Sequence, residues 1–252
     1  MQSAPPDIFS RPRKRAAQAR ADSLRTGPDP ADYLLRAMSE DVFDRLGFLR
    51  FVPETVLLEG FGSELLRTAE WEDGSSFDST RGDDFGHPLP LVSQSYEMVA
   101  SINSIGTVND VPGALIQMRE LLVPGGLAIA SFLGGGSLPR LREAMLAAEP
   151  DRPAPRIHPM IDPRSCPSLL ARAGWKDPVV DSWTLQVRFP ALRRLVGDLR
   201  DQAMGNVLAR PAPPLSREAL ARAEAAFARH AEPDGKVTET FEIVTLTGRR
   251  PA

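Results

Sequence analysis

Residues that carry metal, redox and disulfide chemistry are scarce in this chain. Its 252 residues include one cysteine, Cys166, and three histidines. A single cysteine excludes an intrachain disulfide framework, fits a reducing compartment, and lacks the companions that a cysteine-based zinc site requires. His158 and Asp162 would supply only two ligands at helical spacing, so we expect no metal site.

Long apolar runs are missing as well. No segment approaches the roughly 20 residues of a membrane span, and the N-terminus is rich in proline and arginine where a signal peptide would be apolar. The net charge is -3 and the isoelectric point is near 5.7, which provides no electrostatic case for nucleic acid. We therefore expect a soluble cytoplasmic protein with no membrane span and no nucleic-acid partner.

Two common catalytic loops are also absent. No Gly-x-Ser-x-Gly elbow occurs, so no Ser-His-Asp arrangement can be identified. The glycine run at residues 134–137 is not followed by the lysine of a phosphate-binding loop. These absences leave serine hydrolase and nucleotide hydrolase chemistry without support.

The most informative stretch that is present covers residues 95–138. Its pattern predicts a strand at 96–101, an amphipathic helix at 111–122, a Pro-Gly-Gly turn and a strand at 127–132, with Asp110 as the helix N-cap. Strands that alternate with helices indicate a parallel sheet with right-handed crossovers. The length suits one sizeable core, so we expect a flexible basic segment at 1–30 and a single domain at 31–252.

Further elements are predicted on both sides of this stretch. Residues 1–7 are expected to be disordered, 64–71 to be either helix or strand, and 72–90 to be mostly loop. Helices are expected at 8–24, 32–49, 138–148, 162–173, 190–204 and 216–230. Strands are expected at 54–58, 178–183, 184–189 and 237–247, and the last ones would make the sheet mixed.

Four longer segments carry a family resemblance. They are DYLLRAMSEDVFDRL (32–46), VNDVPGAL (108–115), LLVPGGLAIASFLGGGSLPRLR (121–142) and RIHPMID (156–162). The chain resembles the class I S-adenosylmethionine (SAM) methyltransferases, and within them the branch of the malonyl-carrier-protein methyltransferase of biotin synthesis and the assembly factors of respiratory complex I. The run at 132–142 and the HPMID segment are more typical of the assembly factors.

This resemblance implies an α/β fold and a cofactor. The implied fold is a Rossmann-like class I methyltransferase sheet with flanking helices, an N-terminal helical cap and a helical substrate-side insertion. The implied cofactor is SAM, and its donor loop would be LEGFGSEL (58–65). Gly60 and Gly62 occupy two of the glycine positions that let the backbone approach the amino-acid part of SAM. Glu64 stands at the third, and Glu59 is the displaced candidate for the acidic residue.

Other implied cofactor contacts follow this loop. GDDF (82–85) resembles the motif whose acid contacts adenine, which makes Asp83 and Asp84 candidates. Ser101 and Asn103 stand where relatives line the SAM pocket. A tight turn at Gly60 and Gly62, and a solvated turn at 82–85, are the alternatives that do not involve a cofactor.

The donor half departs from the family pattern in three ways. Only 20 or so residues separate Gly62 from Asp83, where a helix, a strand and another helix would normally fit, so we expect part of this half to be missing or compressed. Gly106-Thr107 stands where many relatives carry His-Trp. No clear apolar strand precedes the candidates for the acid that binds the ribose: Glu70, Glu72 and Asp73.

Two further features are candidates for contacts with a substrate or partner. Arg156 and His158 are positioned by the resemblance near the substrate entrance, where they would bind a carboxylate or shuttle a proton; simple loop packing is the alternative. The basic run at 11–20 is either a solvated helix face or a surface for an acidic protein partner or protein substrate.

Three hypotheses about function remain open on the sequence alone. The first is a SAM-dependent methyltransferase with a divergent donor site, possessing few visible catalytic residues because methyl transfer depends mainly on positioning. The second is a non-catalytic assembly or scaffolding factor that has lost SAM binding. The third is another SAM- or cofactor-dependent reaction, such as the hydroxylation associated with the assembly-factor branch.

Overall fold

The computed structural model describes residues 7–68, 75–80, 94–151 and 153–252. The chain forms two compact units. We name the first the helical unit, Met1–Ala31, Gly136–Pro159 and Thr184–Glu242, and the second the sheet unit, Asp32–Gly135, Met160–Trp183 and Ile243–Ala252. The expectation of disorder at 1–7 lies outside the described residues except at Asp7.

The described strands form one mixed sheet in the order β2-β1-β3-β4-β6-β5. Strand β1 pairs in parallel with β2 and β3, β3 pairs in parallel with β4, and β4 pairs antiparallel with β6. The strands are β1 (Thr55–Glu59), β2 (Ser76–Thr80), β3 (Tyr96–Ile102), β4 (Leu122–Leu133), β5 (Lys176–Phe189) and β6 (Val237–Arg249). This is the Rossmann-like sheet that the sequence predicts.

Seven α-helices and three 3-10 turns accompany the sheet in the described part of the chain. The helices are α1 (Arg11–Leu24), α2 (Tyr33–Leu49), α3 (Val111–Leu121), α4 (Pro139–Ala148), α5 (Cys166–Ala173), α6 (Leu192–Asp201) and α7 (Arg217–Ala228). The 3-10 turns are η1 (Ser63–Thr68), η2 (Ile105–Thr107) and η3 (Pro163–Ser165). None of the described helices is long and apolar enough to cross a membrane.

Side-chain caps set where several helices begin. Asp110 accepts the backbone N–H of Gly113 at 2.9 Å and starts α3, as the sequence predicts. Ser216 accepts the N–H of Ala219 at 3.1 Å and starts α7 in the same way. Gly174 then ends α5 in the left-handed conformation, with φ at 71°, because glycine has no Cβ to oppose it.

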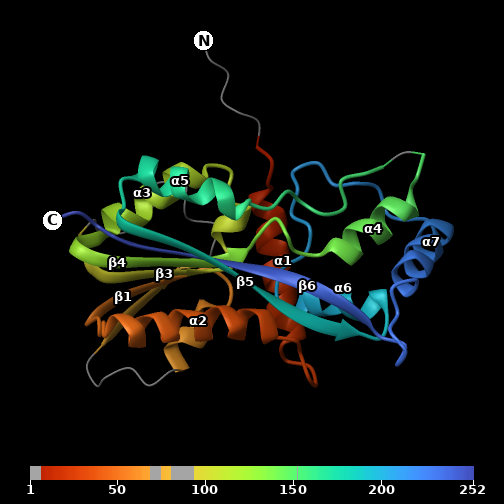
Figure 1. Cartoon of the computed structure of the whole chain (residues 1–252), viewed down its shortest axis with the longest axis horizontal. Coiled ribbons are helices and arrows are strands. Elements are labelled where there is room, and N and C mark those ends of the chain that lie inside the picture. The colour runs from red at the N-terminus through yellow and green to blue at the C-terminus, as the bar shows by residue number, and fades with distance from the viewer. Residues whose placement is uncertain (1–6, 69–74, 81–93, 152) are drawn as a thin grey trace, which may run out of the picture. The chain divides into compact units, whose positions relative to one another are not determined.

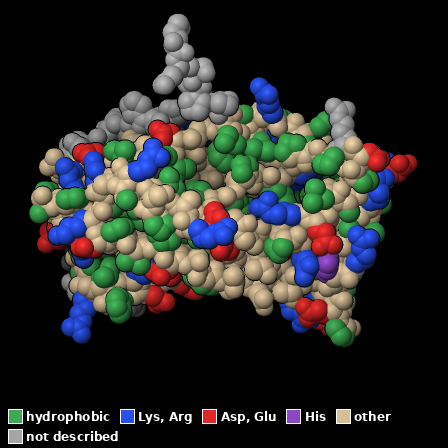
Figure 2. Space-filling view, turned by 45° about the horizontal axis from the view of Figure 1, so that its top comes forward, with side chains coloured by type: hydrophobic (Ala, Val, Ile, Leu, Met, Phe, Trp, Pro, Cys, Tyr) green, Lys and Arg blue, Asp and Glu red, His purple; other side chains and the backbone are tan. Residues whose placement is uncertain are grey.

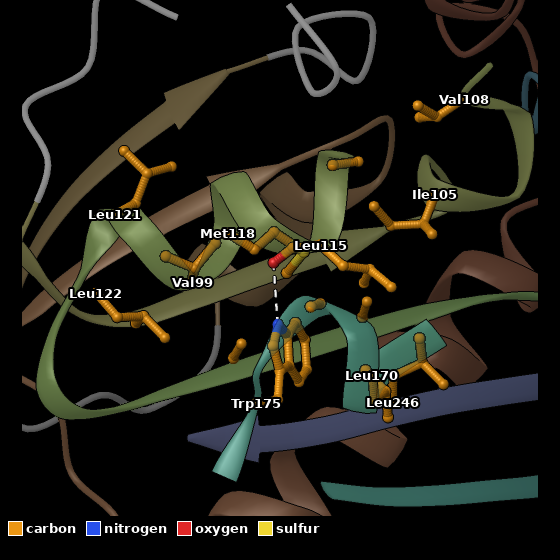
Figure 3. Close-up of a cluster of buried hydrophobic side chains, with 14 of the residues drawn as sticks. Val99, Ile105, Val108, Leu115, Met118, Leu121, Leu122, Leu170, Trp175 and Leu246 are labelled. Atoms are coloured by element: carbon orange, nitrogen blue, oxygen red, sulfur yellow. Dashed lines mark hydrogen bonds between the residues drawn. The ribbon is translucent and has the colours of Figure 1, made fainter. Parts of the chain in front are cut away.

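The sheet unit has helices on both faces of its strands, with α2 on one side and α3 and α5 on the other (Figure 1). Helix α2 buries an apolar stripe that includes Leu35, Met38 and Val42, at the spacing of one helix face. A cluster of buried apolar side chains between the sheet and helices α3 and α5 forms a hydrophobic core (Figure 3). At its centre, the indole N–H of Trp175 donates to the carbonyl of Leu115 at 2.9 Å.

Several element predictions were wrong in detail. Residues 76–80, expected to be loop, form the edge strand β2. The side chains of this strand are largely exposed, so its sequence SFDST does not show the apolar residues by which a buried strand is recognised. Residues 162–173 divide into η3 and α5, and the two strands expected at 178–189 are one continuous strand, β5. The Pro-Gly-Gly turn lies within β4, whose pairing with β3 shifts register between Tyr96 and Met98.

Candidate functional site

The predicted donor site lies at the point where the strand order of the sheet reverses. The chain passes from β1 to its neighbour β2 on one side, and then to β3 on the other side of β1. In open α/β sheets, ligands bind beyond the carboxyl ends of the strands at such a switch point. Gly60 follows β1 and Asn103 follows β3, so the topology brings these two predicted residues to the same edge of the sheet.

Glu59 and Ser101 are directly paired across β1 and β3. The Ser101 hydroxyl donates to Oε2 of Glu59, and both side chains are buried. Ionised carboxylates are costly to bury without such hydrogen bonds. The sequence therefore identified two residues that lie together, although it did not indicate that they bond to each other.

The two glycines of the loop are required by the protein itself. Both have φ near +100°, and a Cβ on Gly60 would lie 2.0 Å from the carbonyl oxygen of Ile102. A Cβ on Gly62 would lie 2.7 Å from Leu35. The tight-turn alternative is thus sufficient to explain both glycines, and a substitution at either position would test folding before it tested cofactor binding.

Glu64 contacts the loop that it follows. Its Oε2 accepts the backbone N–H of Gly62 at 3.0 Å, and its side chain is exposed. A backbone amide of this loop is therefore already bonded to a carboxylate of the same chain. The sequence marked Glu64 only as the residue at the third glycine position, and this hydrogen bond is a finding of the structure.

The rest of the predicted donor half is only partly described. Asp83 and Asp84 lie outside the described residues, as do Glu70, Glu72 and Asp73. Between β1 and β3, the described residues contain a 3-10 turn and one strand, and the predicted compression of this half stays a prediction.

Arg156 holds its own loop together. Its guanidinium donates to Glu149 at 2.7 and 2.8 Å and to the carbonyl of Pro213 at 2.7 Å. These bonds join the segment that follows α4 to the segment that precedes α7, within the helical unit. They support loop packing for Arg156, and its predicted contact with a substrate stays a prediction.

His158 is buried in the helical unit. Its ring meets Phe9 edge-on, with ring centroids 5.7 Å apart. Burial, followed by the charges of Arg142 and Lys14, lowers the pKa of His158 from 6.5 to about 4. At neutral pH the imidazole is therefore uncharged, and its predicted contact with a substrate stays a prediction.

The basic helix α1 has both a buried and an exposed side. Lys14, Gln18 and Ala21 form its buried face, whereas Arg13 and Arg20 are exposed. Hydropathy could not predict this face, because only one of its three residues is apolar. On the molecular face drawn in Figure 2, basic and acidic side chains are interspersed and no large patch of one sign is visible.

The glycine-rich run before α4 is bound by two glutamates of β6. Glu242 accepts the N–H of Gly136 at 2.7 Å, and the Glu239 carboxylate accepts the N–H groups of Arg140 and Leu141 at 3.2 and 2.8 Å. Glu239 thereby satisfies free amides at the start of α4. Burial raises the pKa of Glu239. The run at 132–142 thus has a structural role that the sequence did not reveal.

Metal-binding groups form no cluster in the described part of the chain. No set of three or more His, Cys, Asp or Glu side chains there could hold a metal ion. Cys166 is a buried thiol in the core of the sheet unit.

Comparison with solved structures identifies the class of fold. A candidate methyltransferase from Bacillus halodurans superposes with a TM-score of 0.50 at 10% identity, over 83% of this chain and 98% of that one. No family model matches the sequence. The chain therefore has the fold of the class I methyltransferases.

Sequence comparison identifies the relatives within that class. Arginine-hydroxylase NDUFAF5, mitochondrial, of Danio rerio is 29% identical over 79% of this chain and 63% of its own length, and the human protein of that name is 31% identical over 64% and 48%. Malonyl-[acyl-carrier protein] O-methyltransferase of Halorhodospira halophila is 33% identical over 63% and 53%. The chain matches about half to two-thirds of the length of these relatives. The chain is similar in sequence to both groups, which confirms the predicted resemblance.

Proposed function

We propose that this chain binds SAM beyond the carboxyl ends of β1 and β3 and transfers its methyl group. The observation that carries the proposal is the switch point, where the loop after β1 and the end of β3 meet on one edge of a parallel sheet. The relatedness to a malonyl-carrier-protein O-methyltransferase supports the same chemistry.

The described residues fit the amino-acid end of SAM under one condition. Gly60 and Gly62 present backbone without side chains, and the carboxylate of Glu59 lies beside the loop. The N–H of Gly62 is bonded to Glu64, so a bound carboxylate would have to displace that side chain. When bound, SAM would supply the methyl group, and the protein would hold donor and acceptor in line.

Titration calorimetry with SAM tests the proposal, and Glu64 provides the sharpest variant. We expect wild type to bind with a Kd below about 1 mM, and Glu64→Gly to bind about tenfold more tightly because the competing carboxylate is gone. A gain in affinity cannot result from misfolding, unlike the loss expected for a glycine variant.

Glu64→Gln is the matched control. It keeps the length and the hydrogen-bond acceptor of the side chain and removes the charge, so its affinity should lie between those of wild type and Glu64→Gly. If neither wild type nor Glu64→Gly binds SAM more tightly than 1 mM, the methyltransferase proposal is wrong. Tighter binding to wild type than to Glu64→Gly would mean that Glu64 is a SAM ligand and not a competitor.

The Glu64 contact itself favours a second candidate, a non-catalytic assembly or scaffolding factor. In that role the loop would keep Glu64 on the Gly62 amide, and protein contacts would be made by α1, whose exposed Arg13 and Arg20 suit an acidic partner. Charge reversal of both arginines to Glu should abolish recovery of a partner in pulldown, whereas Glu64→Gly should leave it unchanged.

Mass spectrometry of any recovered partner distinguishes the remaining reactions. An added methyl group would support methyl transfer, and an added oxygen would support the hydroxylation that the name of the Danio rerio relative states for that protein. A partner recovered without either change would support the assembly role. A link to respiratory complex assembly belongs to this proposal, and it rests on the resemblance alone.

A further inference from the structure

The donor loop that follows β1 is itself buried. Glu59, Phe61 and Ser63 are 0%, 3% and 4% exposed, and Gly60 and Gly62 between them are buried as well. A ligand can lie against the backbone of a loop only in a conformation that exposes that backbone. The loop therefore has to change its conformation before it can bind the amino-acid end of SAM.

The polar groups of the two glycines are bonded within the chain. The carbonyl of Gly60 accepts the hydroxyl of Ser63 at 2.9 Å and the backbone N–H of the same residue at 3.4 Å. The N–H of Gly62 donates to Glu64 at 3.0 Å, and its carbonyl accepts the N–H of Leu65 at 3.0 Å. These groups are thus satisfied in the closed turn without a ligand.

Neighbouring side chains pack directly against both glycines. A Cβ on Gly62 would lie 2.7 Å from Leu35, so this buried residue of α2 contacts the backbone of the loop. A Cβ on Gly60 would lie 3.2 Å from the Cβ of Ser104, which follows β3 and is also buried. The space beside each glycine is therefore filled by the sheet unit itself.

We infer that residues 60–65 form a gate that the chain holds closed, and that SAM binds only after this turn opens. Opening breaks the bonds that Ser63 and Glu64 make with the glycines and moves the turn away from Leu35. The part of the inference that concerns SAM rests on the proposed function. A gate of this kind lowers the apparent affinity for SAM in proportion to the fraction of molecules that are open.

Hydrogen exchange of the ligand-free protein tests the gate by itself. The amides of Gly62 and Leu65 are hydrogen bonded, so they exchange only when the turn opens. We expect both to exchange with one common opening free energy, at least about tenfold faster than the slowest amides of β3, and with little dependence on urea. If they exchange only together with the slowest amides of β3, the turn opens by global unfolding and the gate is overturned.

Ser63→Ala separates opening of the turn from competition for the ligand. The hydroxyl of Ser63 is bonded to a carbonyl, and the carboxylate of SAM cannot take its place there because both groups are acceptors. Loss of this one hydrogen bond should weaken the closed turn. Exchange of Gly62 and Leu65 and the affinity for SAM should each rise about fivefold.

Ser75→Ala is the matched control. The hydroxyl of Ser75 also donates to a carbonyl, that of Pro53, at 2.9 Å. These residues precede β2 and β1, so they lie at the opposite ends of these strands from the gate. This variant should accelerate the slowest exchange in β3 and leave the exchange of Gly62 and the affinity for SAM unchanged. Equal effects of the two variants on both quantities would overturn the gate.

The gate and the proposed function fail in different ways. Fast exchange of the turn, with no SAM binding by wild type or by Ser63→Ala, would support the gate and overturn SAM binding. SAM binding that Ser63→Ala leaves unchanged or weakens would overturn the gate and leave the proposed function standing. If Ser63→Ala fails to fold, exchange in the wild-type protein still decides whether the turn opens.

Discussion

At the residue scale, the glycines of the donor loop illustrate how one residue type can satisfy two requirements. Gly60 and Gly62 match a cofactor motif in sequence, yet each is also demanded by a close approach within the protein. The backbone conformation at both positions disfavours any side chain. Their presence is therefore compatible with SAM binding without being evidence for it.

Substitution of Gly60 should destabilise the protein in the absence of any ligand. Gly60→Ala places a Cβ 2.0 Å from the carbonyl oxygen of Ile102 at positive φ, and we expect the free energy of unfolding to fall by at least about 2 kcal/mol. Urea unfolding measures the change. Gly47→Ala is the matched control, because a Cβ there meets nothing within 4 Å in helix α2. It should be neutral or stabilising by about 1 kcal/mol, and equal losses for both variants would contradict this account.

His158 should make the protein less stable in mild acid. Its folded pKa of about 4 lies below the ordinary value of 6.5, so the unfolded chain binds the proton more tightly. Stability is therefore complete above pH 6.5 and is lost as the pH falls toward 4, by on the order of 3 kcal/mol. Unfolding free energies measured from pH 7 to 4 should show this slope in wild type. The slope should be smaller in His158→Gln, and an unchanged slope would show that other groups cause it.

At the element scale, helix α4 depends on a glutamate from a distant strand. Glu239 of β6 accepts the amide N–H groups of Arg140 and Leu141, and Leu138, which precedes the helix with φ at 62°, has no side-chain acceptor that could cap it. The helix begins where it does because a tertiary contact replaces a local one.

Loss of Glu239 should free the start of α4. We expect Glu239→Ala to lower the free energy of unfolding by about 1–3 kcal/mol, since one buried and one partly buried amide lose their acceptor. Glu218→Ala is the matched control in the same unit, because Glu218 is exposed in the first turn of α7, and should cost less than about 1 kcal/mol. Hydrogen exchange of residues 140 and 141 should accelerate only in Glu239→Ala.

Strand β2 shows why one element escaped prediction. Its sequence SFDST has no apolar alternation, and its exposed edge position requires none. Its hydrogen bonds are made with β1, whose apolar run was recognised as a strand. The strand at 96–101 was predicted closely because it is a short apolar run. The helix at 111–122 was predicted closely because Asp110 caps it and its apolar residues recur at helical spacing.

At the scale of the whole molecule, the predicted donor site belongs to one of the two compact units. The donor loop lies in the sheet unit, whereas α1, α4 and α7 lie in the helical unit. Ligand binding stabilises the part of a protein that forms the site.

SAM should therefore protect the sheet unit. We expect SAM to slow the hydrogen–deuterium exchange of amides at the ends of β1 and β3 and to leave exchange in α1 and α7 unchanged. Equal protection of α1 and α7 would contradict a donor site in the sheet unit. Sodium chloride at matched ionic strength is the control.

The sequence by itself determined the α/β fold class, because buried parallel strands and amphipathic helices leave periodic apolar patterns that survive without knowledge of their partners. The resemblance marked Glu59 and Ser101 as cofactor candidates, and their role stays a prediction. Only the tertiary structure decided that Glu64 binds the Gly62 amide and that Glu239 starts α4. The first bond depends on how the loop turns, and the second joins residues 98 positions apart in the sequence, so neither is recorded in a local sequence pattern.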